Sequence, residues 1–158
     1  MATREEIING LQFTVAQAKR TTALYAEGEW DWKRESGWTP KEIYSHLAAT
    51  AGIVPGFAQG MLAAAEDQDL AVGLDINTMN DQAVSGMASM TPEQVMQAFE
   101  ANYGALIDFV KTAPDDILNS RRRFLSETVP VSDIVASSIM LHGLHHVYEA
   151  YARPMAGA

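Results

Sequence analysis

The segment WTPKEIYSHLA, residues 38–48, marks the start of a helix and carries one of the four histidines of the chain. Thr39 and Glu42 have the spacing of a capping box, in which a hydroxyl and a carboxylate each accept a hydrogen bond from a backbone N–H at the helix start. Pro40 suits the first helical position, where its missing N–H is not needed. Apolar residues then recur at helical spacing, so the segment predicts a buried helix over about 40–65.

The rest of the chain contains three more helix starts, two of them marked by a capping box. The segments TREE at 3–6 and TPEQ at 91–94 repeat the capping box, and a fourth start lies within 129–132. No segment alternates polar and apolar residues for long enough to predict a strand, and we expect the basic run at 121–123 to lie in a solvated turn. We therefore predict an all-α, four-helix bundle that forms a single domain over residues 1–158, with further helices over about 3–27, 92–112 and 131–152.

The composition is that of one globular domain, with 158 residues, 47% hydrophobic and 20% charged. A net charge of −9 argues against a nucleic-acid partner, which would require a basic face. Cysteine is absent, which excludes disulfides and thiolate metal ligands, so any thiol chemistry requires a thiol carried on a small molecule.

Two features argue against targeting to a membrane or out of the cell. The N-terminus lacks the basic region and apolar run of a signal peptide. Residues 43–65 carry no charged side chain, but they include His46, Pro55 and many alanines and glycines, so they predict a buried helix rather than a membrane span. We expect a cytoplasmic protein with no membrane partner.

Three of the four histidines lie within LHGLHH, residues 141–146. Residues four apart share one face of a helix, so His142 and His146 can bind one ion, whereas His145 lies about 100° around the helix from His146. The remaining histidine, His46, is the candidate for a third ligand. Neutral imidazoles suit zinc, nickel, iron or copper, of which we expect zinc or nickel, and three protein ligands leave a position open, as in catalytic sites.

The depth of these histidines predicts the topology of the bundle. His46 lies roughly 10 Å below the start of its helix, and His142 and His146 lie roughly 9–15 Å from the end of the last helix, at 1.5 Å per residue. These depths match only if the second and fourth helices are antiparallel. That arrangement is up-down-down-up, and it requires a long crossover between the second and third helices, where the gap at 66–90 is the longest in the chain.

The segment 38–48, the preceding EWDW at 29–32 and the pair His142 and His146 resemble the DinB-like superfamily, which includes the mycothiol-dependent maleylpyruvate isomerases and the bacillithiol transferases. The resemblance covers nearly the whole chain. It implies an up-down-down-up bundle, often a homodimer, with a divalent metal held by three histidines. On this sequence the metal ligands fall on His46, His142 and His146.

The sequence also departs from this pattern. Many members follow the last histidine with Arg-Gly-Gln, where this chain has VYE at 147–149. We expect no counterpart of the additional C-terminal domain of the isomerases, so the resemblance does not extend to their substrate. Some members bind no metal, which leaves the activity less determined than the fold.

We expect a divalent-metal-dependent enzyme, a transferase that activates a small-molecule thiol for attack on a small-molecule substrate. A hydrolase at the same site, or a non-enzymatic ligand-binding or dimeric interaction module, are the alternatives. His145 and Glu149 are the candidates for proton exchange or for orienting a ligand ring, although Glu149 fits an exposed helical charge equally well.

Other residues have two interpretations each. Trp38 either walls the substrate pocket or simply packs over the bundle end. Asn77 and Asn80, in the crossover, either contact the site or serve as turn and cap residues. The small residues spaced by four along the second helix either form a dimer face or make room for neighbouring core side chains. These are Ala48, Gly52, Gly56 and Gly60.

Overall fold

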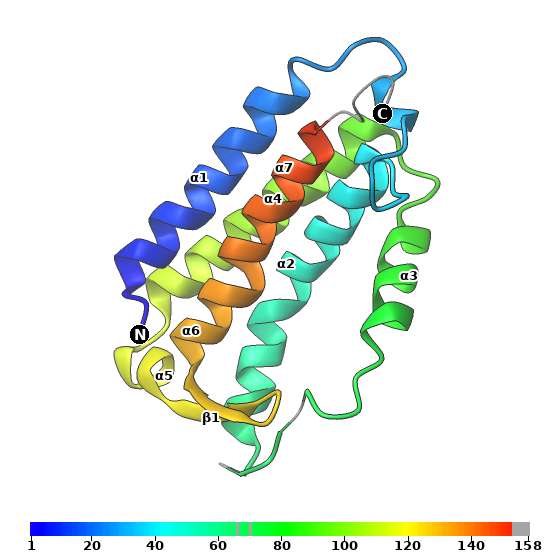
Figure 1. The fold of residues 1–158 in the computed structure, drawn as a ribbon. Helices are drawn as coiled ribbons and strands as arrows, with labels where there is room; N and C mark the ends of the chain where they lie inside the picture. The colour runs from blue at the N-terminus through cyan, green and yellow to red at the C-terminus, as the bar shows by residue number, and fades with distance from the viewer. Residues whose placement is uncertain (66, 70, 153–158) are drawn as a thin grey trace.

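Four long helices form the body of the protein in the computed structural model, which describes residues 1–65, 67–69 and 71–152, apart from the side chain of residue 138. The fourth is built from three consecutive pieces, so the bundle consists of α1 (Arg4–Thr22), α2 (Pro40–Ala63), α4 (Pro92–Thr112), and α6 (Val131–Val135) continuing through η2 (Ala136–Leu141) into α7 (His142–Tyr151) (Figure 1).

The topology of the bundle is up-down-down-up, as predicted. Figure 1 shows α1 and the final helix running in one direction and α2 and α4 running in the other. The crossover between α2 and α4 contains one further helix, α3 (Ile76–Gly86), which packs beside α2. Each of α1 and α2 packs against both α4 and α7, so α2 and α7 are antiparallel neighbours.

The predicted capping boxes begin three of the helices. In α1 and α2, Thr3 pairs with Glu6 and Thr39 with Glu42, and α4 uses Thr91 in the same way. The first helix ends at Thr22, earlier than expected, because the chain turns over 23–28 into the short 3₁₀ helix η1 (Glu29–Asp31).

The expectation of no strand was wrong at one place. After the short helix α5 (Asp115–Asn119), the strands β1 (Arg121–Phe124) and β2 (Glu127–Pro130) pair as an antiparallel hairpin, so the basic run lies in a strand rather than in a solvated turn. The polar–apolar alternation is hidden because an inward position is occupied by Arg122, whose Nε donates to the Met61 carbonyl at 3.1 Å. The fold remains mostly helical.

The core fills the space between the four helices. Its largest fully buried apolar side chains are Ile7, Leu11, Ile43, Tyr44, Leu47, Phe99, Tyr103, Leu106 and Ile139. None of the helices in the described part of the chain combines the length and apolar character that a bilayer-spanning helix requires.

The last helix is not a regular α-helix throughout, since η2 is a π-helical segment just before His142. Such segments widen one turn and rotate the side chains that follow, and they are frequent beside functional sites.

Gly143 allows α7 to approach α1 and α4. A Cβ at this position would lie 2.4 Å from the Tyr103 Oη and 3.1 Å from the Thr14 Cγ2, and both residues are fully buried. We expect Gly143→Ala to lower the free energy of unfolding by about 1–3 kcal/mol, because overpacking outweighs the better helix propensity of alanine. Urea denaturation measures this change.

The control for this prediction is Tyr103→Phe. The Tyr103 hydroxyl is buried and has no hydrogen-bond partner among the described residues. Its removal should therefore cost little by itself, and it should relieve most of the penalty of Gly143→Ala. If Gly143→Ala lowers the free energy of unfolding equally in the wild type and in Tyr103→Phe, the contact with the Tyr103 hydroxyl is not the cause of the loss.

Candidate metal centre

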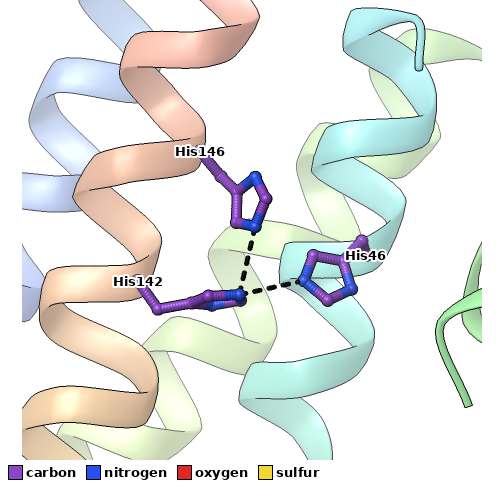
Figure 2. A group of neighbouring side chains, drawn as sticks. All are labelled: His46, His142 and His146. Atoms are coloured by element: carbon purple, nitrogen blue, oxygen red, sulfur yellow. Dashed lines mark hydrogen bonds between the residues drawn. The ribbon is translucent and has the colours of Figure 1, made fainter. Parts of the chain in front are cut away.

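Three histidines from two antiparallel helices meet inside the bundle. His46 comes from the second turn of α2, and His142 and His146 come from successive turns of α7 (Figure 2). The His142 Nε2 lies 3.3 Å from the His46 Nε2 and 3.1 Å from the His146 Nε2. The structure thus brings together the three residues that the depth argument placed at one level.

The spacing of the three rings, and the charge state of two of them, fit a divalent metal. Three nitrogens at 2.0–2.1 Å from a tetrahedral ion lie roughly 3.3 Å from one another. Burial, together with the neighbouring histidines, lowers the pKa of both His46 and His142 to about 4, so these imidazoles are neutral at neutral pH, as metal ligation requires. The Nδ1 atoms of both rings have no hydrogen-bond partner among the described residues, so only the convergent Nε2 atoms are engaged.

Glu149 orients one of the three rings. The Nδ1–H of His146 donates to the Glu149 Oε2 at 2.7 Å, and both side chains are mostly buried. In a neutral ring, this bond leaves the lone pair on Nε2, the nitrogen that faces the cluster. Of the two rings that Glu149 could steady, the structure selects His146, and Glu149 is not a freely exposed charge.

His145 lies outside the three-histidine cluster. It is exposed, and its ring centroid is 5.2 Å from that of His146. His145, His146 and Glu149 do form a second group whose donor atoms lie within 4.8 Å of one another. We favour the first group, because its three imidazole nitrogens converge in a more buried place, whereas the carboxylate of the second is already bonded to an imidazole N–H.

Trp38 covers the histidine cluster. Its ring centroid lies 5.3 Å from that of His46 and 6.3 Å from that of His146, on which it stacks with an interplanar angle of 25°. It is not among the residues that line the large cavity described next. The indole therefore packs on the histidine rings and does not wall the cavity.

A cavity of about 680 Å³ opens beside the cluster, with His46 and His142 in its wall. Its size lies within the range of small-molecule sites. Asn80 of α3 lines it, whereas Asn77 does not and is exposed. This cavity could not be predicted from the sequence, because its wall combines α2, α3, the hairpin and the last helix, and no local pattern links these segments.

Replacing Glu149 with glutamine should weaken metal binding by about tenfold. The carboxylate is the acceptor that holds the His146 ring, and loss of such a partner costs about 10–100-fold in affinity. Competition with a chromogenic chelator measures the dissociation constant. Glu127→Gln, an exposed carboxylate on the hairpin, is the matched control and should leave that constant unchanged.

The comparisons with known proteins rest on structure. At the level of sequence, no family model and no curated protein matches the chain. The mycothiol-dependent maleylpyruvate isomerase superposes with a TM-score of 0.74 at 15% identity over 96% of this chain, and a variant of it with one histidine replaced by alanine gives 0.73 at 14%. The chain spans 62% of the length of that isomerase.

The match to a second solved structure covers a larger share of that structure's own chain. YfiT from Bacillus subtilis, described as a probable metal-dependent hydrolase with an unusual four-helix bundle topology, matches with a TM-score of 0.71 at 15% identity, over 93% of this chain and 83% of YfiT. These matches confirm the fold that the resemblance in the sequence implied: the chain has the four-helix bundle fold that the maleylpyruvate isomerase and YfiT share.

Proposed function

We propose that the protein is a divalent-metal-dependent enzyme, and that it is a transferase in which His46, His142 and His146 hold zinc or nickel and a small-molecule thiol is the nucleophile. The observation that carries this proposal is the convergence of three imidazole nitrogens beside an apolar cavity that has His46 and His142 in its wall. A divalent ion bound there would lower the pKa of a coordinated thiol or water, so that a nucleophile forms at neutral pH.

The protein's own groups would supply binding and orientation. Glu149 holds the His146 ring, and Trp38 shields one side of the cluster from water. The cavity would bind the electrophile next to His46 and His142. His145, exposed beside His146, is our candidate for exchanging the released proton with solvent.

A thiol-transfer assay tests this proposal. With 1-chloro-2,4-dinitrobenzene, the thiol sulfur bonds to the aromatic carbon, the C–Cl bond breaks, chloride leaves and the thiol proton goes to solvent. We expect a rate above the uncatalysed reaction that requires both a metal and one member of a panel of low-molecular-weight thiols. The His46→Ala variant should lose this rate, and a wild-type rate in that variant would contradict the proposal.

A hydrolase is the second candidate, and the good coverage of YfiT favours it. If the protein is a hydrolase, it should cleave neutral aryl esters in a reaction that requires a metal but no thiol. Turnover in neither assay, by protein shown to retain metal, would favour a non-enzymatic ligand-binding module.

We also propose a homodimer formed through one face of α2. Ala48 is buried, whereas Gly52, Gly56 and Gly60 are exposed, and Gly52 also makes room for Asn102 of α4. A Cβ at Gly56 would meet nothing within 4 Å, so the monomer should tolerate Gly56→Leu, whereas close approach of two copies should not. Light scattering at micromolar concentration should show a dimer for the wild type and a monomer for this variant.

A further inference from the structure

The cavity extends far from the histidine cluster. Along α2 its wall runs from His46 to Met61, which corresponds to roughly 22 Å at 1.5 Å per residue. On the final helix it runs from His142 back to Val131, in the antiparallel direction. The cavity is therefore elongated along the bundle axis, with the histidines at one end.

The wall of this cavity is apolar and uncharged. No Asp, Glu, Lys or Arg is among its lining residues in the described part of the chain. Thr50, one of its few polar side chains, already donates its hydroxyl to the His46 carbonyl at 2.9 Å. Beyond the histidines the wall is mainly aliphatic and methionine side chains, with two phenylalanines. This surface favours an uncharged, flexible apolar group, because a charge would be desolvated without a partner.

The hairpin supplies Phe124 and Leu125 to the wall, at the end away from the histidines. The Phe124 ring contacts the Phe57 ring edge-on, with centroids 6.1 Å apart. Leu125 and Ser126 form the two-residue turn, and both have positive φ, at 51° and 72°. A left-handed conformation costs about 1–2 kcal/mol for a residue with a Cβ, and glycine or asparagine is the usual choice.

Contacts from the rest of the protein hold this strained turn in place. The Ser126 N–H donates to the Asp69 Oδ2 at 2.7 Å, and Arg122 ties β1 to the end of α2. Strain of this kind persists where the surroundings determine it, and it is frequent at ligand sites. Here it sets the exposed side chain of Leu125 against the far end of the cavity.

We propose that the cavity binds an extended alkyl chain of an uncharged substrate, and that Phe124 and Leu125 limit the length of that chain. This inference rests on the proposed function for the reacting end of the substrate, which lies at the histidines, but the tail site is independent of the metal. The histidine end then selects the reaction, and the hairpin end selects chain length.

Binding of linear primary amides, from butanamide to dodecanamide, tests the proposal by calorimetry. Each added methylene should raise the affinity by up to about fourfold, the equivalent of about 0.8 kcal/mol, until the chain reaches the hairpin and the affinity stops rising. Leu125→Gly removes the side chain and suits the positive φ, so it should fold and should move this limit to longer amides. Phe124→Ala should move it in the same direction.

Ser126→Gly is the matched control, since it relieves the same kind of strain without altering the lining of the cavity. It should leave the length limit unchanged. The proposal is overturned if wild-type affinity does not depend on chain length, or if Leu125→Gly and Ser126→Gly shift the limit equally. It is also overturned if amide binding disappears at protein concentrations where the molar mass in solution doubles. A second copy of the protein would then cover Ile53 and Leu125, and the apolar surface would be a dimer interface.

One further variant separates this proposal from the enzymatic one. His146 is not among the lining residues, so His146→Ala removes a metal ligand and should leave amide binding intact. Length-dependent amide binding without metal retention in the wild type would support the tail site and contradict the enzyme. Metal-dependent thiol transfer with no length dependence would support the enzyme and contradict the tail site.

Discussion

Replacing His142 with alanine should lower the affinity for zinc or nickel by at least about a hundredfold while leaving the helices folded. The His142 Nε2 is the central atom of the cluster, since it lies within 3.3 Å of both other Nε2 atoms. Structural zinc sites bind with about 10–16 kcal/mol over four ligands, so one ligand contributes roughly 3 kcal/mol. Elemental analysis of untagged protein and chelator competition measure the loss, and circular dichroism checks the fold.

The control for this prediction is His145→Ala. His145 is exposed and outside the three-histidine cluster, so its replacement should leave metal affinity unchanged. The opposite result, with metal lost in His145→Ala and kept in His142→Ala, would assign the ion to the group of His145, His146 and Glu149 and would remove the main support for the proposed enzyme.

The architecture of the bundle could be predicted because its signals are local. The capping boxes at Thr3, Thr39 and Thr91 depend on residues three apart, and the structure contains all of them. The topology followed from one arithmetic step, because the rise of a helix converts residue number into depth. That step needed only His46, the pair on α7 and the long gap between α2 and α4.

The cavity beside the histidines could not be predicted in the same way. The cavity depends on how the α3 crossover and the hairpin pack against α2, which are contacts between segments far apart in the sequence. The hairpin was missed because Arg122 occupies an inward position in a four-residue strand. The π-helical segment directly before His142 was not predicted either, because a single widened turn leaves no separate periodic pattern in the sequence.

A buried ion pair in the segment that connects α1 to α2 could also not be predicted from the periodicity of apolar residues. Arg34 Nη2 lies 3.0 Å from the Glu29 Oε1, and both side chains are fully buried. The Arg34 Nε also donates to the Ala150 carbonyl at 2.8 Å, at the end of α7, while the Glu29 Oε2 accepts from the Ala26 N–H at 2.9 Å. The pair thus ties the loop to the last turn of the histidine-bearing helix.

Replacing Arg34 with methionine should therefore lower the free energy of unfolding by about 3–5 kcal/mol, because Glu29 is left as a buried charge without its guanidinium. Urea denaturation measures the loss, and Lys33→Met, an exposed neighbour, should change stability by less than about 0.5 kcal/mol. The double variant Glu29→Met with Arg34→Met should lose less than the sum of the single variants, because no charge remains buried. Additive losses would show that the two side chains act separately.

The Arg34→Met variant should also affect the proposed metal centre, through a backbone hydrogen bond. The Arg34 N–H donates to the Trp38 carbonyl at 2.7 Å, and the Trp38 indole stacks on His146. Loosening of this turn should make the indole more accessible, which acrylamide quenching of tryptophan fluorescence would detect at denaturant concentrations where the bundle is still folded. Metal affinity should fall less than in His142→Ala, because Arg34→Met loosens the Trp38 cover over the histidine rings but removes none of the three nitrogens.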